Sequence, residues 1–183
     1  VSVVEVADRQ LALHFVNGKF ASVLCRGKYA FWSQIDKHEY KFVDISTPEV
    51  AADVPEYIFS EIPAAYYTKV EVLEYQKARL YFNQKFVRIL DAGTYYFWEN
   101  GVKIDVSFVD VRLTQMNIAG QEILTQDKVS LRINFVCSYR VTDYVKILTE
   151  IDDFAEQMHV EAQLALREYV GRYKLDEILD NKA

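Results

Sequence analysis

GTYYFW, residues 93–98, follows a near copy of itself, GKYAFW at residues 27–32. The likeness extends well beyond these letters, because aligning residues 4–48 with residues 70–114 without a gap gives 17 identities in 45 positions. Identity at this level over one fixed offset is the signature of an internal repeat. The chain therefore contains two related segments, and each carries a glycine followed by closely spaced aromatic residues.

Each repeat is predicted to form a small antiparallel β-unit. In the first copy, Asn17-Gly18 lies between two apolar runs and predicts a tight hairpin, because both turn positions of such a hairpin need a positive φ. The second copy has Asn83-Gln84 at the same place, which is a weaker turn sequence. A heavy load of aromatic residues, 13 Tyr, 11 Phe and 2 Trp, also favours β-structure.

The apolar alternation changes phase near the end of each repeat. The change falls between Phe42 and Val43 in the first copy and between Phe108 and Val109 in the second. A slip of one residue in a pattern of period two is typical of a β-bulge. We therefore predict a bulge at the same place in both repeats.

The pattern changes twice in the rest of the chain. Residues 129–141 have apolar side chains at every odd position, which is the period of a half-buried strand. Residues 150–173 switch to helical spacing with one apolar stripe, and Gly171 is the expected stop. A short helix is expected over residues 176–181.

These patterns predict an α+β protein, in which duplicated antiparallel β-units precede a long strand and C-terminal helices. All three prolines fall within residues 46–67, where the first repeat gives way to a connector. The predicted segments are a first β-repeat at 1–48, the connector at 49–67, a second β-repeat at 68–118, and the strand with its helices at 119–183.

Charge and composition exclude several classes of function. The net charge is −6 and no Lys/Arg cluster is present, which argues against nucleic-acid binding. The longest stretches without a formal charge, residues 10–18 and 113–121, are far shorter than the ~20 apolar residues that cross a bilayer. Cys25 and Cys137 lie too far apart in sequence to suggest a disulfide framework or a zinc motif.

We find no pattern of catalytic residues. His14, His38 and His159 have no second ligand at metal spacing, and no nucleophile or phosphate-binding motif occurs. Glu122 and Asp127 flank an expected turn, where solvated acids are ordinary. We therefore expect no enzyme, no catalytic, cofactor-binding or metal-binding residues, and no cofactor.

Three separated stretches carry a family resemblance. Gly120–Asn134, continuing to Tyr139-Arg140-Val141, resembles the central segment of the stomatin, prohibitin and flotillin superfamily, also called SPFH or band 7. Leu164–Gly171 and Leu175–Leu179 are similar to the helical segment that follows in stomatins and bacterial slipins. Residues 74–110 fit the first subdomain of the family, so the resemblance covers about residues 70–183 and is closest to slipins.

The resemblance implies that 68–118 is the first SPFH subdomain, that 119–183 is the second, and that 1–48 is an extra copy of the first. One motif departs from the family, because Ala92-Gly93-Thr94 stands where Gly-Pro-Gly is usual. The sequence starts after the family's membrane hairpin or helix and ends before its coiled coil. We therefore expect a soluble piece of a longer, membrane-associated protein of bacterial origin.

The family's known role implies a non-enzymatic scaffold of slipin or stomatin type that oligomerises and organises or regulates membrane proteins. The implied partners are other copies of the chain, a membrane surface and a membrane protease of the NfeD type. An alternative from a different class is a soluble β-rich module that binds a peptide or a small ligand.

Neighbouring side chains on a strand point to opposite faces. Tyr29 and Phe31, like Tyr95 and Phe97, therefore share one face in each copy and are expected in the core. Tryptophan and tyrosine favour the interface of a bilayer. The opposite face is thus either a membrane or partner contact or a face covered by another element of the chain, and its aromatic residues are Trp32, Tyr96 and Trp98.

Overall fold

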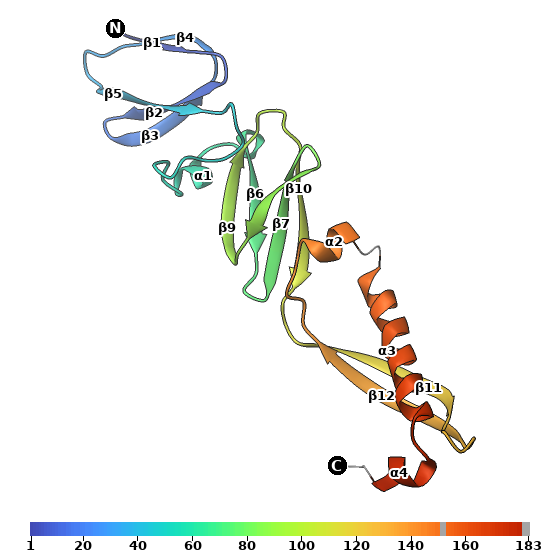
Figure 1. The fold of residues 1–183 in the computed structure, drawn as a ribbon. Helices are drawn as coiled ribbons and strands as arrows, with labels where there is room; N and C mark the ends of the chain where they lie inside the picture. The colour runs from blue at the N-terminus through green and yellow to red at the C-terminus, as the bar shows by residue number, and fades with distance from the viewer. Residues whose placement is uncertain (151–152, 181–183) are drawn as a thin grey trace. The chain divides into compact units, whose positions relative to one another are not determined.

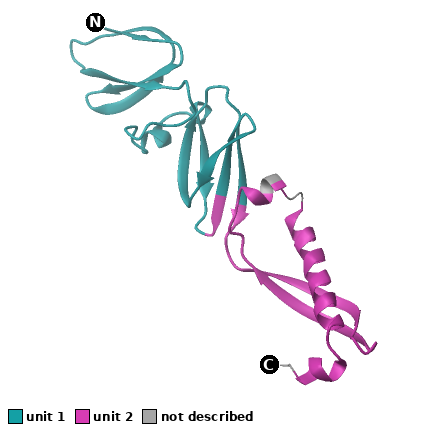
Figure 2. Ribbon diagram, in the orientation of Figure 1, with its two compact units in different colours: residues 1–74, 78–108 teal, residues 75–77, 109–183 magenta. Residues whose placement is uncertain are grey.

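The computed structural model describes residues 1–150 and 153–180, which form twelve strands and four α-helices (Figure 1). The chain divides into two compact units (Figure 2). Unit 1 consists of residues 1–74 and 78–108, and unit 2 of residues 75–77 and 109–183. Strands dominate unit 1, whereas unit 2 combines a strand ribbon with the C-terminal helices, which agrees with the predicted α+β class.

Both repeats have the same order of strands and the same antiparallel pairing. The first strand pairs with the fourth, and the second lies between the third and the fifth. The first repeat contains β1 (Ser2–Val6), β2 (Gln10–Val16), β3 (Lys19–Leu24), β4 (Gly27–Phe31) and β5 (His38–Asp44). The second contains β6 (Tyr67–Val72), β7 (Gln76–Phe82), β8 (Lys85–Leu90), β9 (Gly93–Trp98) and β10 (Ile104–Asp110).

The correspondence extends to single contacts at equivalent positions of the two repeats. Val4 pairs with Tyr29 as Val70 pairs with Tyr95. The hydroxyl of Tyr29 donates to the carbonyl of Cys25 at 3.0 Å, and that of Tyr95 donates to the carbonyl of Asp91 at the same distance. The glycine two residues before each tyrosine has a φ of 146° in the first copy and 149° in the second, a backbone conformation that side chains other than hydrogen rarely allow. This requirement explains why glycine and tyrosine recur together in GKYAFW and GTYYFW.

The predicted hairpin turns are confirmed. Asn17 and Gly18 have φ values of 51° and 78°, and Asn83 and Gln84 have φ values of 49° and 64°. Both asparagine side chains also accept a backbone N–H from the loop before the fifth strand of their repeat, that of Lys37 at 2.9 Å in the first copy and that of Lys103 at 3.0 Å in the second. Gln84 therefore occupies a left-handed position that glycine fills in the first repeat.

The bulge predicted at Phe42/Val43 is wrong. Strand β5 pairs with β2 without a break through this point, with Phe42 opposite Ala12 and Val43 opposite Leu11. The apolar alternation changes phase because residues on both faces of β5 are packed. Tyr40 packs in the core of the first repeat, and Val43, on the opposite face, packs in a second cluster outside it. The register shift lies instead in the β2–β3 hairpin, and its counterpart lies in β7–β8. The bulge expected in β10 stays a prediction.

Each repeat has its own core, built from matching residues. Val4, Val6, Ala12 and Leu24 are buried together in the first repeat. Their counterparts in the second repeat are buried with Leu80 and Phe97, and they are Val70, Val72, Ala78 and Leu90. Tyr29, Phe31 and Tyr95 pack against these cores from β4 and β9, as expected for that face.

The connector between the repeats holds α1 (Ile58–Glu61) and a 3₁₀ turn (Ala64–Tyr66). Four of its apolar side chains are buried, namely Val54, Ile58, Phe59 and Ile62, whereas a simple linker would leave them exposed. They join a third cluster that also takes residues from both repeats, namely Leu11, Leu13, Val43, Val54, Ile58, Phe59, Ile62 and Trp98. The connector is therefore part of the packed structure of unit 1.

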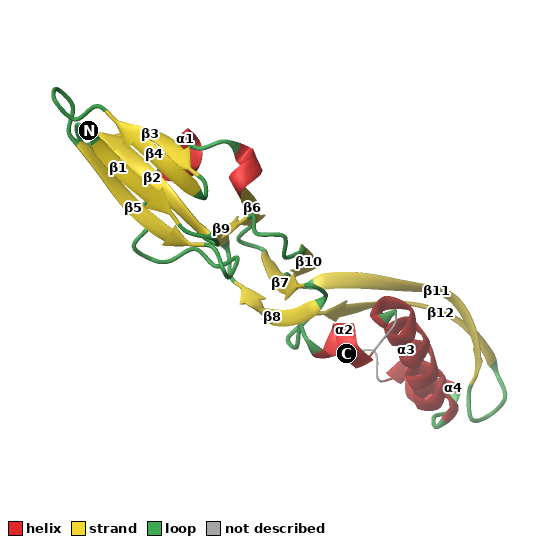
Figure 3. Cartoon of the chain, turned by 90° about the horizontal axis from the view of Figure 1, so that it is seen from above, coloured by secondary structure: helices red, strands yellow, loops and turns green. Residues whose placement is uncertain are grey.

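Unit 2 contains a long antiparallel ribbon and the C-terminal helices (Figure 3). The ribbon pairs β11 (Thr114–Leu124) with β12 (Ser130–Tyr139), and exposed and half-buried residues alternate along β12 as the sequence predicts. Helix α3 (Phe154–Gly171) contacts β11 and begins at Asp153, whose side chain accepts the N–H of Glu156. Two shorter helices flank it, α2 (Lys146–Glu150) and α4 (Leu175–Asp180).

Helix α3 ends at Gly171, the stop that the sequence predicts. The predicted helix 150–173 also spans residues 151 and 152, which lie outside the described residues, as does residue 181 of the predicted short helix.

The two turns offer a matched test of the backbone argument. A residue other than glycine in the left-handed region costs about 1–2 kcal/mol, part of which is offset by the smaller entropy of its unfolded chain. We expect Gln84→Gly to raise the free energy of unfolding by about 0.5–1 kcal/mol and Gly18→Gln to lower it by a similar amount. Chemical denaturation measures both, and equal effects of the same sign would contradict the turn assignment.

Candidate functional site

Trp98 lies at the centre of the third cluster. It is fully buried, its ring centroid lies 5.3 Å from that of Phe59 in α1, and Tyr96 stacks on the same Phe59 ring at 4.2 Å. The connector also runs along the edge of β9, where the N–H of Trp98 donates to the carbonyl of Pro48 at 2.7 Å. The indole Nε1 has no hydrogen-bond partner in the part of the chain that the structure describes, so Trp98 acts through packing.

This burial corrects the expectation of a surface contact at Trp98. Its face of β9 is covered by the connector and by Leu11, Leu13 and Val43 of the first repeat. Cover by the chain itself, the alternative raised above, therefore describes Trp98. Tyr96 is half-buried in the same cluster and remains only partly accessible.

Trp32, the counterpart of Trp98, is 76% exposed. It follows β4 directly, and Ile35 in the same loop is 95% exposed. Val3 pairs with Ala30 across the β1–β4 sheet, and both residues are exposed as well. The first repeat thus presents an apolar face where the second repeat has a covered one.

A pair of histidines holds the loop that carries Trp32. Nε2 of His38 lies 2.9 Å from the carbonyl oxygen of Trp32, and Nδ1 of His38 lies 2.9 Å from Nε2 of His14. Because a carbonyl only accepts, Nε2 of His38 carries the proton and its Nδ1 accepts the N–H of His14. The hydroxyl of Ser22 then faces the remaining nitrogen of His14 at 3.3 Å. This arrangement satisfies the hydrogen bonds of both imidazole rings with each ring neutral.

Burial, and next the repulsion that a second positive charge would meet beside His38, lower the pKa of His14 below its ordinary value. The side chain is 3% exposed and contacts the rings of both Phe31 and Tyr40. A neutral, stacked pair gives the Trp32 loop a fixed attachment to β2 and β5. Its role in the first repeat is thus to position the loop.

Two histidines do not make a metal centre. Within residues 1–150 and 153–180, no three His, Cys, Asp or Glu side chains lie close enough to hold a metal ion. Asp127 accepts hydrogen bonds from the Thr125 hydroxyl at 2.5 Å and from the Leu175 N–H at 3.2 Å. The Thr125 bond is the main reason why the pKa of Asp127 is lowered, so this carboxylate orders the turn after β11.

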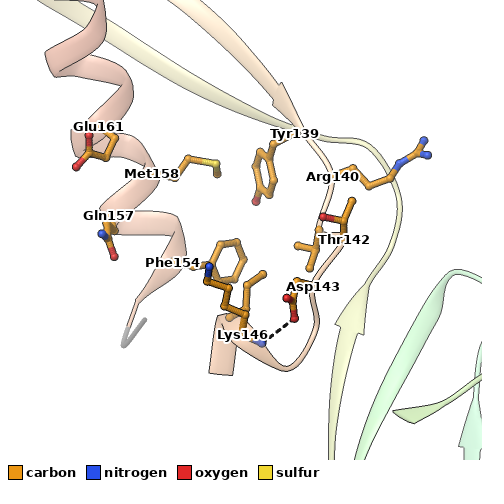
Figure 4. Close-up of a pocket in the computed structure, with 11 residues that line it drawn as sticks. Tyr139, Arg140, Thr142, Asp143, Lys146, Phe154, Gln157, Met158 and Glu161 are labelled. Carbon is orange, nitrogen blue, oxygen red and sulfur yellow. Dashed lines mark hydrogen bonds between the residues drawn. The ribbon is translucent and has the colours of Figure 1, made fainter. Parts of the chain in front are cut away.

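Unit 2 has an apolar cavity of about 430 Å³ between the end of β12, α2 and α3 (Figure 4). Tyr139, Phe154 and Met158 point into it, and the two aromatic rings meet edge to face with centroids 6.2 Å apart. Arg140 points away from the cavity. The lining surface is mostly apolar, with Asp143, Lys146 and Glu161 among the residues around it, so it suits an apolar group.

Sequence reasoning missed this cavity because its lining comes from three separate elements. The available signals were weak. Val141 continues the apolar phase of β12 beyond Tyr139, its last residue, and Phe154 and Met158 repeat at i, i+4 on α3. In the same described part of the chain, no helix is both long enough and apolar enough to cross a membrane.

Comparison with known proteins gives the class of this chain. The model of the SPFH domain / Band 7 family matches residues 70–183, which are the second repeat, the ribbon and the C-terminal helices. The chain therefore belongs to the SPFH domain / Band 7 family.

Its relatives include stomatins. A stomatin homolog of Pyrococcus horikoshii is 29% identical over 114 residues, covering 61% of this chain and 41% of that protein. Mouse stomatin-like protein 3 is 34% identical over 74 residues, covering 40% of this chain and 26% of that protein. An uncharacterized protein of Archaeoglobus fulgidus is 36% identical over 74 residues, covering 40% and 30%.

The chain thus spans less than half the length of the curated relatives it matches. These relatives come from archaea and an animal, so the expected bacterial origin and the closer likeness to slipins find no support among them.

The two tryptophans are expected to differ sharply in their effect on stability. Trp98→Ala removes a fully buried ring and should lower the free energy of unfolding by about 3–5 kcal/mol. Trp32→Ala removes an exposed ring and should change it by less than about 0.5 kcal/mol. Denaturant titration measures the free energy of unfolding of both variants. An equal loss for Trp32→Ala and Trp98→Ala would show that the first repeat also buries its tryptophan.

Proposed function

We propose that this chain is a non-enzymatic module of a membrane-associated scaffold of stomatin type. The observation that carries this proposal is the family match over residues 70–183, and the similarity to stomatins supports it. The module organises or regulates membrane proteins by holding them in an assembly. It acts through surfaces, which fits a chain whose clusters are apolar and whose histidines position a loop.

Residues 1–48 act in this proposal as an added copy of the first SPFH subdomain. The family match begins at residue 70, yet the first repeat has the same strand order and the same pairings as the matched second repeat. An added copy provides a second β-surface on the same scaffold. Trp32 is the residue of that surface for which we propose a membrane or partner contact, because its ring is accessible and tryptophan favours such interfaces.

Self-association and a membrane client complete the proposed role. The resemblance to slipins implies that the full-length protein assembles as a homo-oligomer. It also suggests a membrane protease of the NfeD type as the client. One observation favours a second function: the apolar cavity of unit 2 has the size of a small-ligand site, which fits the alternative of a ligand-binding module.

Cell fractionation combined with cross-linking tests the scaffold role. The protein in its natural host is expected in the membrane fraction, and a lysine-reactive cross-linker should give a ladder at multiples of the protomer mass. Washing with high salt should leave the protein on the membrane, because contacts made through apolar groups are not screened. A protein recovered as a monomer outside the membrane fraction would contradict the scaffold role.

A further inference from the structure

The apolar face of the first repeat has a covered counterpart at the equivalent positions of the second. Val1 corresponds to Tyr67, Ala30 to Tyr96 and Trp32 to Trp98. The three counterparts in the second repeat all pack in the third cluster. In the first repeat all three residues are exposed, Val1 to 68%. The segment that covers these positions in the second repeat therefore indicates what kind of segment fits the exposed face of the first repeat.

The cover over Trp98 begins as an extended segment on the outer edge of β9. The carbonyl of Pro48 accepts the N–H of Trp98, and Glu49 forms a bridge with Phe97. The carboxylate of Glu49 reaches Arg88 of the neighbouring strand β8, with both oxygen–nitrogen distances at 3.4 Å. Backbone pairing thus sets the position of this segment, and a carboxylate adds a charged contact.

The same cover continues as a short apolar helix. Val50 and Val54 lead into α1, where Ile58 and Phe59 are buried against the Trp98 face. The complete covering segment is residues 46–62, STPEVAADVPEYIFSEI. Its features are an extended stretch with proline, an acidic residue next to it, and apolar residues that follow at short intervals.

The matching edge of β4 is open. Within the described residues, β4 pairs with β1 alone, and the pairing of Ser2 with Phe31 has the same register as that of Thr68 with Phe97. Because strand amides alternate in direction and the two strand pairs share one register, the N–H of Ala30 in β4 faces the outer edge, on the same side as the N–H that Trp98 donates to Pro48. The histidine pair fixes the carbonyl of Trp32 beside this edge. The first repeat thus has the backbone edge and the ring, without the covering segment.

The outer edge of β4 also carries a cation, Lys28, that an acidic residue of a bound segment can contact. Lys28 stands where the second repeat has Thr94, while Ser22 stands where it has Arg88. Lys28 is paired with Glu5 at 3.3 Å, but both side chains are mostly exposed, and such pairs contribute little. An incoming carboxylate would therefore find its cation at Lys28 and not on β3.

We propose that the outer edge of β4, together with Trp32, binds an extended segment of a partner protein by strand addition. The segment has the chemistry of residues 46–62: a proline-containing extended stretch with an acidic residue, followed by apolar side chains that cover the indole ring. Main-chain hydrogen bonds supply the pairing and the ring supplies the apolar contact, as in other strand-addition complexes. The inference rests on the proposed role of Trp32 as a contact residue and does not depend on the scaffold role.

A synthetic peptide of residues 46–62 provides the probe. Titrated into the whole chain, it should shift tryptophan emission to the blue in a saturable manner, because Trp32 moves out of water while Trp98 is already buried. A fluorescently labelled peptide gives the affinity by anisotropy. Trp32→Ala should weaken it by at least about tenfold, as expected for a central aromatic anchor.

Two further variants separate an edge site from a general apolar surface. Ala30→Pro removes an outward N–H of β4 without touching the bonds to β1, and should also weaken binding by about tenfold or more. Tyr57→Ala changes an exposed apolar residue of the connector and should leave the affinity unchanged. Circular dichroism and the unfolding midpoint check that both variants fold. A scrambled peptide of the same composition should not bind.

Vesicles of neutral phosphatidylcholine form the second arm. A blue shift with vesicles and none with the peptide would overturn the peptide inference and leave the membrane contact at Trp32. No shift with either would overturn both. Peptide binding that survives Trp32→Ala and Ala30→Pro would also overturn the inference, because the peptide would then lie elsewhere.

Discussion

The packing of Trp98 is the interaction on which unit 1 depends. Its ring comes from the second repeat, the residues above it come from the connector, and Leu11, Leu13 and Val43 come from the first repeat. A buried aromatic removes about 150–250 Å² from water, which at ~25 cal/mol per Å² amounts to roughly 4–6 kcal/mol. Whole domains are stable by about 5–15 kcal/mol. One ring therefore contributes a large share of what joins the two repeats.

The repeats share their inner structure and differ in their outer faces. Core residues, hairpin turns and the glycine–tyrosine bends recur at the same positions. Outside the core, Leu13 packs in the third cluster, whereas its counterpart Arg79 is buried and donates to the hydroxyl of Ser107 at 2.7 Å. Duplication kept the fold of each copy because the core demands it, and the outer faces were free to take different partners. The second copy now has its Trp98 covered, and the first copy presents Trp32.

Local chemistry made much of this fold predictable from the sequence. Asn17-Gly18, the alternation along residues 129–141 and the stop at Gly171 each depend on a few neighbouring residues, and each is confirmed. The bulge at Phe42/Val43 was wrong because an alternation cannot distinguish a slipped register from a strand that is covered on both faces.

The candidate contacts were harder to predict for a related reason. Trp32 and Trp98 have the same local sequence, and only the connector decides which of them is buried. The sequence predicted only a connector here, because its prolines hide the spacing of Val54, Ile58 and Ile62. The cavity of unit 2 likewise needs three elements to meet, which no single stretch of sequence encodes.

The packing of Trp98 couples the two repeats energetically. A double-mutant cycle between Leu13 in the first repeat and Trp98 in the second measures this coupling directly. The free energies of unfolding of Leu13→Ala, Trp98→Phe and the double variant, measured by denaturant titration, should deviate from additivity by at least about 0.5 kcal/mol, as expected for residues in one packed cluster. Additive effects, within about 0.3 kcal/mol, would show that the repeats are stabilised independently and would contradict coupling through Trp98.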